Sequence, residues 1–419
     1  MIFKRQQFVN QLIEHKNNQM IKVITGIRRC GKSFLLFKLF YNHLISSGIA
    51  SDHIICIRLD NRLDAELRNP DKCLAYILSR IIDKDAHYYL LIDEVQKMDE
   101  FEDVLNTCLQ IANLDCYVSG SNSKLLSSDI ITEFRDRGDE IRLQPLSFSE
   151  YWEAFPDKSW EQAWSEYSTY GGLPYTLLLP SETRKIKYLK ELFRKTYFRD
   201  IVDRYHIKDD VALGRLLDVL CSSVGSLTNP KKLEDTFLSS GRIRLTDVTI
   251  KQYIEYFKDA FLLNEAERYD VKGKRYISTP LKYYLTDLGL RNARLNFRQV
   301  EETHLMENAI YNELIYRGYS VDVGVVDVYD KDENGRQIRK QIEIDFVVNQ
   351  GSQRFYIQSA FAIPNGDKET QELRPLNNVH DSFKKIVIVN ADILLRRNEN
   401  GIVTMGLRQF LTDPDSLLL

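Results

Sequence analysis

A short stretch near the start of the chain combines two glycines, a lysine and a serine at a fixed spacing. Gly31 follows Gly26 by five residues and is followed at once by Lys32 and Ser33, which fits the pattern G-x-x-x-x-G-K-[ST]. Glycines let a loop bring its N–H groups close to phosphate oxygens, the lysine adds positive charge, and a serine hydroxyl suits Mg²⁺. The pattern predicts phosphate contacts from Gly26, Ile27, Arg28, Arg29, Cys30, Gly31, Lys32, Ser33 and Phe34.

The residues around this loop supply the expected setting. Ile21, Val23 and Ile24 precede it as a short apolar run suited to a buried strand, and residues 34–45 carry apolar groups at helical spacing. A strand, a loop and a helix in this order place the positive end of the helix next to the bound phosphate. We therefore expect ATP and Mg²⁺ as the cofactors, with Ser33 as one metal ligand.

A pair of acids fits the second half of a nucleotide-hydrolysing site. Asp93 ends an aliphatic run, where a carboxylate can hold the Mg²⁺ shell, and Glu94 follows it directly. A glutamate in that position can polarise a water molecule as a general base. The alternative, a solvent-facing acidic pair at a strand end, is disfavoured by the phosphate loop upstream. We expect Asp93 as a metal ligand and Glu94 as a catalytic residue.

Three further polar residues fit supporting roles. Asn122 follows the next expected strand, where its amide could hydrogen-bond the attacking water or the γ-phosphate. Arg135 and Arg137 follow it in a segment rich in acids. An arginine supplied by a neighbouring copy can stabilise charge on the transferring phosphoryl group, but arginines flanked by acids also typify a salt-bridged surface. Both interpretations of the two arginines stay open.

The composition is that of a globular protein with more than one domain. The chain has 419 residues, of which 43% are hydrophobic and 28% charged, and its net charge is −3. The six cysteines show no metal-site spacing, so we expect a reducing cytoplasmic location. No apolar run approaches the roughly 20 residues that span a bilayer, and the N-terminus lacks the apolar core of a signal peptide. We expect no membrane partner.

The order of the predicted elements divides the chain into four parts. Strand-like and helical runs alternate through residues 1–150, which predicts an α/β fold with a parallel sheet. Residues 151–207 are helical in pattern and form an expected lid or linker. Residues 208–298 carry three helical runs and a two-stranded ribbon, which is a winged-helix layout. Residues 299–419 read as another, smaller α/β unit.

The chain resembles bacterial and archaeal AAA-type P-loop ATPases that carry a C-terminal domain of unknown function. The ATPase motifs that carry this resemblance are Thr25-Gly-Ile-Arg-Arg-Cys-Gly-Lys-Ser33, Leu90-Leu-Ile-Asp-Glu-Val-Gln96, Ser119-Gly-Ser-Asn-Ser-Lys-Leu-Leu126 and Pro145-Leu-Ser-Phe148. Downstream motifs are Tyr170-Gly-Gly-Leu-Pro174, Phe198-Arg-Asp-Ile201 and Lys282-Tyr-Tyr-Leu-Thr-Asp-Leu-Gly289. The resemblance implies a P-loop domain, a helical lid, a winged helix and a restriction-nuclease-like domain.

The C-terminal part resembles the PD-(D/E)xK nuclease core, in which carboxylates bind Mg²⁺ and a lysine assists water activation. Glu307, Glu343 and Asp345 match its acidic positions, whereas Gln358 and Ala360 stand where an acid and a lysine are expected. Glutamine carries no charge for the metal, and alanine cannot assist a proton transfer. The resemblance therefore implies a degenerate nuclease site and a domain that serves in binding or assembly.

Basic residues in the winged-helix part suggest salt-sensitive contacts with DNA, although a solvated surface would look the same. These residues are Lys231, Lys232, Arg242, Arg244, Lys251, Lys272, Lys274 and Arg275. The main hypothesis is an ATPase whose cycle moves the downstream domains, with DNA or a protein client as partner and a homo-oligomer if an arginine acts between copies. The alternatives are a nucleotide-gated binding switch, an ATP-driven DNA nuclease and a small-molecule kinase.

Overall fold

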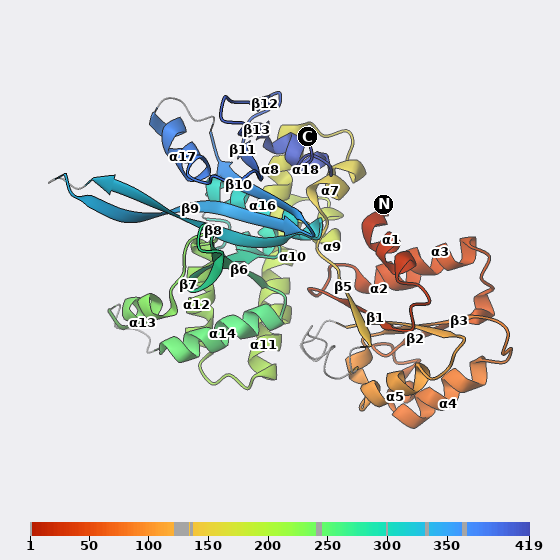
Figure 1. Ribbon diagram of the computed structural model, residues 1–419. Coiled ribbons are helices and arrows are strands. Elements are labelled where there is room, and N and C mark those ends of the chain that lie inside the picture. Colours follow the sequence, from red (N-terminus) through yellow and green to blue (C-terminus); the bar gives the residue numbers. More distant parts are fainter. Residues whose placement is uncertain are drawn as a thin grey trace. The chain divides into compact units, whose positions relative to one another are not determined.

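The computed structural model describes residues 2–120, 134, 137–239, 245–298, 301–331, 335–362 and 367–419, with the backbone alone at 367–370. The chain divides into two compact units (Figure 1). The amino-terminal unit comprises Met1–Leu146 with the short segments Leu173–Tyr175 and Asp259–Phe261. The carboxyl-terminal unit comprises Ser147–Gly172, Thr176–Lys258 and Leu262–Leu419.

The amino-terminal unit is built on a five-stranded parallel sheet with the order β2-β3-β4-β1-β5. Its strands are β1 (Ile21–Thr25), β2 (Ile54–Arg58), β3 (Tyr88–Asp93), β4 (Leu114–Ser119) and β5 (Gly138–Arg142). Every residue of β1, β3 and β4 is buried, as expected for strands with helices on both faces. The predicted parallel sheet and its fifth strand at residues 139–143 are confirmed.

Helices cover both faces of this sheet (Figure 1). On one face α4 (Pro70–Arg80) and α5 (Phe101–Cys108) pack against the apolar strand residues. On the other face lie α1 (Gln6–Glu14), α2 (Lys32–Phe34) and α3 (Tyr41–Ser46). A π-helical segment, Leu35–Phe40, joins α2 to α3, so the helix that follows the phosphate loop runs from Lys32 to Ser46. Single-turn 3-10 helices occupy Ser51–His53, Ala65–Arg68 and Val95–Lys97.

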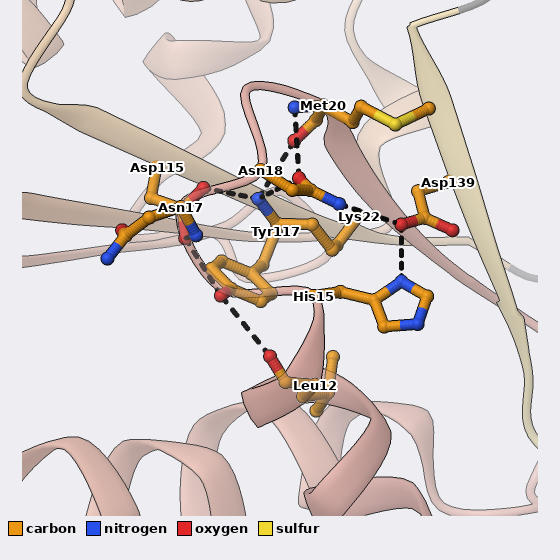
Figure 2. A network of polar contacts seen from close by, with 9 residues as sticks. All are labelled: Leu12, His15, Asn17, Asn18, Met20, Lys22, Asp115, Tyr117 and Asp139. Atoms are coloured by element: carbon orange, nitrogen blue, oxygen red, sulfur yellow. Dashed lines mark hydrogen bonds and ion pairs between the residues drawn. The ribbon is translucent and has the colours of Figure 1, made fainter.

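A buried polar network holds the amino ends of these strands next to the carboxyl end of α1 (Figure 2). The ammonium of Lys22, a fully buried residue of β1, forms an ion pair with Asp115 of β4. The Tyr117 hydroxyl donates to Asp115 at 2.8 Å, and the backbone N–H of Asn17 donates to the same carboxylate at 3.0 Å. A buried charge is tolerated only when its partners are complete, so this network has a structural role. It ties the loop after α1 to the sheet.

The carboxyl-terminal unit begins with helices and ends with a mixed sheet. Its first helices are α7 (Phe148–Ala154), α8 (Trp160–Tyr170), α10 (Glu182–Leu192), the π-helical Phe193–Phe198, and α11 (Arg199–Arg204). The short α9 (Pro174–Leu177) begins in the segment assigned to the amino-terminal unit and ends in this one. Ser147 and Ser159 form capping boxes at the starts of α7 and α8, because each side chain accepts from a backbone N–H three residues on. Then come α12 (Asp210–Ser222), α13 (Pro230–Ser239) and α14 (Asp247–Asp259).

Eight strands form one mixed sheet in the order β12-β13-β11-β10-β9-β8-β6-β7. The strands are β6 (Leu263–Asp270), β7 (Arg275–Leu285), β8 (Ser320–Lys331), β9 (Gln337–Gln350), β10 (Gln353–Ala360), β11 (Lys384–Val389), β12 (Arg396–Arg397) and β13 (Val403–Gly406). Among the described residues, the helices after α14 are α15 (Leu288–Arg294), α16 (Glu302–Tyr316), α17 (Asp367–Asn377) and α18 (Leu407–Thr412). The β8–β9 hairpin extends well beyond its neighbours (Figure 1).

The predicted α/β fold is confirmed, and so is the succession of helices and a further small α/β part. The expected ribbon at residues 262–277 is present as β6 and β7, but β6 also pairs with β8 in parallel. One sheet therefore crosses the predicted boundary between residues 298 and 299, and the finer division of residues 151–419 stays a prediction. Within the described residues, no helix has the length and apolar character that crossing a membrane requires.

Candidate active site

The predicted phosphate loop lies at the carboxyl end of β1, directly before α2. Gly26 and Gly31 have φ angles of 129° and 106°, a region that side-chain-bearing residues avoid. The loop backbone passes close to β5, since the Leu143 N–H donates to the Thr25 carbonyl oxygen at 2.9 Å. Of the remaining loop residues, Ile27 and Cys30 are buried, Arg28 is half-buried, and Arg29, Ser33 and Phe34 are exposed.

Lys32 occupies the inside of this loop. Its side chain is buried, and its ammonium donates to the carbonyl oxygens of Gly26 at 2.8 Å and Ile27 at 3.2 Å. These weak carbonyl partners hold a full positive charge at the start of a helix, where the unpaired N–H groups add partial positive charge. The arrangement suits an anion with several oxygens, such as a phosphate.

Ser33 and Asp93 meet although sixty residues separate them in the sequence. Asp93 ends β3 and is only 3% exposed. Its carboxylate accepts a hydrogen bond from the hydroxyl of Ser119, the last residue of β4, and the Ser33 side chain lines the same cavity as Asp93. Burial raises the pKa of Asp93, whereas the hydroxyls of Ser119 and Ser33 lower it. A hydroxyl beside a carboxylate is a donor set that fits Mg²⁺, so these residues suit the predicted metal.

Glu94 follows β3 with a φ of 52°, so the chain turns sharply at this residue. Its carboxylate accepts a hydrogen bond from the side-chain amide of Gln96. Glu94 thus stands directly beside Asp93 at the same edge of the sheet as the phosphate loop. A general base must be near the site and able to accept a proton, and Glu94 meets the first condition.

A cavity of about 490 Å³ opens next to this cluster and contains residues that the sequence analysis missed. Ser33, Phe34 and Asp93 line it, together with Phe37, Lys38, Arg58, Asp60 and Asn61. Arg58 pairs in register with Asp93, because β2 lies beside β3. The negative charge of Asp60 raises the pKa of Asp93. The sequence could have revealed these residues, because polar residues follow the end of β2 and the carboxyl ends of parallel strands lie at the same edge of the sheet.

Of the predicted sensor and arginine residues, Arg137 lies among the described residues. Asn122 and Arg135 lie outside the described residues. Arg137 directly precedes β5, and its carbonyl oxygen accepts from the N–H of Ile21, the first residue of β1. Because β1 and β5 are parallel, Arg137 lies at the amino edge of the sheet and the phosphate loop at the carboxyl edge. Arg137 of one chain is therefore far from the loop of that same chain.

The carboxyl-terminal unit gathers the residues of the predicted degenerate nuclease site. Glu307 projects from α16, Glu343 and Asp345 from β9, and Gln358 from β10. The Gln358 side-chain oxygen accepts from the Asp345 backbone N–H at 3.4 Å, while Ala360 is buried in the apolar core. No group of His, Cys, Asp and Glu side chains within the described part of the chain has the arrangement of a metal site.

A lysine that the sequence analysis named only as the first residue of a family motif lies among these acids. Lys282 of β7 is 3% exposed and forms ion pairs with Glu307, Glu343 and Asp345. Burial alone would lower the pKa of Lys282, but the three carboxylates outweigh burial and raise it. Burial and the charge of Asp345 raise the pKa of Glu307 to about 7, although Lys282 opposes them. The sequence could have indicated this, because Lys282 interrupts a strand whose neighbouring residues are apolar or aromatic, as in a buried core.

Several basic residues predicted to contact DNA have acidic partners of their own. Lys231 pairs with Glu234 at 2.7 Å, and Lys251 pairs with Asp247 at 3.3 Å. Arg275 lies 3.5 Å from Asp270. Arg242 and Arg244 lie outside the described residues. The positive charge of Lys231, Lys251 and Arg275 is thus offset by nearby acids, which weakens the electrostatic case for DNA contacts from these three residues.

Comparison with known proteins identifies two family domains. Residues 18–152 match the AAA domain family, and residues 161–301 match a domain of unknown function, DUF8612. An uncharacterized protein of Haemophilus influenzae is 32% identical over 391 residues, which cover 92% of this chain and 93% of the relative. The uncharacterized protein MJ1544 of Methanocaldococcus jannaschii is 26% identical over 416 residues, with 96% and 87% covered.

Distant structural neighbours include two nucleotide-bound proteins. AMPPCP-bound DnaA from Aquifex aeolicus is 14% identical with a TM-score of 0.31, covering 61% of this chain and 87% of its own. The ADP form of the Aeropyrum pernix ORC2 protein is 12% identical with a TM-score of 0.32, covering 73% and 92%. Similarities this low carry no argument about function, so the AAA domain match and the site geometry provide the functional argument.

Proposed function

The chain belongs to the same protein family as the Haemophilus influenzae relative, and we propose that its AAA domain binds ATP with Mg²⁺ and hydrolyses it. The observation that carries this proposal is that Ser33, which follows the buried Lys32 directly, lines the same cavity as the buried Asp93 carboxylate. Three residues of the required types, from two separate segments, converge at one edge of the sheet. A glycine-rich loop that matched the pattern by chance would not be expected to lie beside a buried carboxylate from another strand.

Each residue has a definite task in this proposal. Lys32 and the loop N–H groups hold the β- and γ-phosphates, while Ser33 and Asp93 hold Mg²⁺, which neutralises charge on the phosphate oxygens. Glu94 accepts a proton from the water that attacks the γ-phosphorus. The bond from that phosphorus to the bridging oxygen breaks, and ADP and phosphate leave.

An arginine finger in this proposal comes from a second copy of the chain. The position of Arg137 supports this. Arg137 lies at the amino edge of the sheet, and the phosphate loop of the same chain lies at the opposite, carboxyl edge. Arg135 and the sensor Asn122 keep their predicted roles within the same proposal. It follows that turnover rises with protein concentration if the copies complete each other's sites.

The downstream domains are proposed as the parts that the ATP cycle moves, with DNA or a protein client as the partner. Helices α12–α14 and the β6–β7 ribbon support a winged-helix assignment for residues 208–298. Residues 299–419 are proposed as a nuclease-like domain without cleavage activity. The six cysteines are free and five are buried, which suits the reducing cytoplasm that we propose as the location.

A nucleotide-gated switch with little turnover is the second candidate. The observation that favours it is the hydrogen bond from Gln96 to Glu94, which occupies the proposed base. Until this bond breaks, the Glu94 carboxylate has less capacity to accept a proton from water. Tight ATP binding by the purified chain without repeated turnover would select this candidate.

The deciding experiment measures phosphate release from ATP and Mg²⁺ by the purified chain, with DNA titrated in at two salt concentrations. We expect turnover that is lost in Lys32→Ala and kept in Lys72→Ala, a lysine on α4 whose side chain is 60% exposed. Stimulation by DNA that weakens with salt would support the DNA partner. An unaltered chain that neither binds nor hydrolyses ATP would refute the proposed function.

A further inference from the structure

Three acidic side chains surround Lys282 as they would surround a bound cation, and the cation at their centre is the Lys282 ammonium. The Lys282 Nζ lies 2.6 Å from Glu343 Oε1, 2.9 Å from Glu307 Oε1 and 3.5 Å from Asp345 Oδ1. These acids come from α16 and β9, and the lysine comes from β7. Two elements thus direct three carboxyl groups at one positively charged atom of a third element.

The carboxylates are held in place by other donors. The Tyr284 hydroxyl donates to Glu307 Oε1 at 2.8 Å, and the Ser359 N–H donates to Asp345 Oδ2 at 2.8 Å. Such bonds fix the acids even when their central partner changes. The lysine is 3% exposed, so its ammonium has exchanged water for these oxygens almost completely.

The charges in the pocket do not balance around a single ammonium. Three carboxyl groups face one ammonium. Glu307, whose pKa is raised to about 7, holds a proton part of the time near neutral pH, but Glu343 and Asp345 alone already place two carboxylates against the single ammonium, and a divalent cation would offset both. Carboxylate oxygens are also the ligands that Mg²⁺ and Mn²⁺ prefer. The side chain of Glu343 is 31% exposed, which gives an ion a path from solvent.

We propose that the Lys282 ammonium is the resident cation of a latent divalent-metal site formed by Glu307, Glu343 and Asp345. The intact chain keeps this site closed to Mg²⁺ and Mn²⁺ with its own side chain. Removing the lysine side chain opens it to one divalent ion. This inference concerns the carboxyl-terminal unit alone and does not depend on the ATPase proposal.

With Lys282 in this site, the carboxyl-terminal unit neither uses a metal ion for catalysis nor needs one to fold. A pocket closed by an ammonium holds no metal-bound water and thus has no metal-activated nucleophile. The unit keeps its fold in the presence of a chelator, unlike domains whose structure depends on a bound metal.

The test uses the full chain carrying Lys32→Ala, without nucleotide, so that the phosphate loop does not contribute to metal binding. Free Mn²⁺ is followed by electron paramagnetic resonance, and thermal unfolding is measured in EDTA and in Mn²⁺. With Lys282 intact, we expect no Mn²⁺ uptake and the same Tm in both solutions. Added Lys282→Ala should lower the Tm in EDTA, take up one Mn²⁺ and recover part of the Tm in Mn²⁺.

Two further variants assign the effect to this pocket. Lys272→Ala, which removes an exposed lysine just before β7, should behave like the parent chain. The pair Lys282→Ala with Asp345→Asn should lose the Mn²⁺ that Lys282→Ala gained. Mn²⁺ retained by that pair, or no Mn²⁺ effect on the Lys282→Ala chain, would overturn the proposal.

One measurement decides the matter even if Lys282→Ala does not fold. Mn²⁺ is titrated into the Lys32→Ala chain with Lys282 intact and, separately, into the same chain with Asp345→Asn. Uptake that Asp345→Asn abolishes would mean that metal enters the pocket beside the lysine, and the proposal would be wrong. Equal behaviour of the two chains, with no Mn²⁺ uptake by either, would support it.

Discussion

The backbone of Gly26 lies against the backbone of Leu143, directly after the ends of the neighbouring parallel strands β1 and β5. A Cβ atom on Gly26 would stand 2.2 Å from the Leu143 carbonyl oxygen, far inside the contact distance of two such atoms. Gly26 also has a φ of 129°. The first glycine of the phosphate loop is therefore required by the neighbouring strand as well as by the loop.

Gly26→Ala should destabilise the amino-terminal unit and abolish ATP binding. The added Cβ would clash with the backbone carbonyl oxygen of Leu143, which cannot move aside as a flexible side chain could. The control is Gly48→Ala, since Gly48 has a φ of 89° but nothing within 4 Å of its added Cβ. The control should lose only the roughly 1–2 kcal/mol of a strained left-handed residue. Denaturant unfolding and nucleotide binding measure both effects. Equal losses in the two variants would contradict the proposed clash.

Glu94→Gln should keep ATP binding and reduce turnover by roughly 10²–10⁴-fold, the usual contribution of a general base. Glutamine preserves the size of the side chain but removes its negative charge and its ability to take a proton. The measurement compares the ATP dissociation constant with the single-turnover rate of hydrolysis. Glu66→Gln, an acid whose side chain is 83% exposed, is the control and should change neither value. Unchanged turnover in Glu94→Gln would exclude Glu94 as the base.

Ser119→Ala should move the acid limb of Mg²⁺-dependent ATP binding to higher pH. The Ser119 hydroxyl donates to Asp93 and lowers its pKa, which burial has already raised. Without this donor the Asp93 pKa rises further, so the carboxylate ionises and binds metal only at higher pH. ATP binding measured at fixed Mg²⁺ across a pH series tests this. Ser79→Ala on the exposed face of α4 should leave the profile unchanged.

Asp322→Asn should flatten the pH dependence of stability in the acidic range. Burial raises the pKa of Asp322 to about 6, so the folded chain holds this proton more tightly than the unfolded chain. The free energy of unfolding therefore falls as pH rises from about 4 to about 6, by roughly 3 kcal/mol for a shift of about two pKa units.

Denaturant unfolding between pH 4 and pH 7 measures this effect, with Asp392→Asn as the control because the Asp392 side chain is 67% exposed. The Tyr276 hydroxyl, 3.2 Å from Asp322 Oδ2, can still donate to an asparagine oxygen. The difference between Asp322→Asn and the unaltered chain should therefore grow with pH. A difference that stays constant across the series would rule out titration of Asp322 as its source.

The sequence by itself determined the elements that depend on local pattern. The glycine spacing from Gly26 to Gly31 predicted the phosphate loop, because loop geometry is fixed within a few residues. The alternation of strands and helices predicted the parallel sheet, since buried parallel strands read as apolar runs. The position of Asp93 at the end of such a run predicted its place at the edge of that sheet.

Only the tertiary structure decided which distant residues meet. The register of β2, β3 and β4 brings Arg58 and Ser119 to Asp93, and the parallel pairing of β1 and β5 puts Arg137 at the opposite edge. Lys282 enters the carboxylate pocket because β7 joins the same sheet as β9. Strand order depends on pairing between segments far apart in the chain, and no local pattern encodes such pairing.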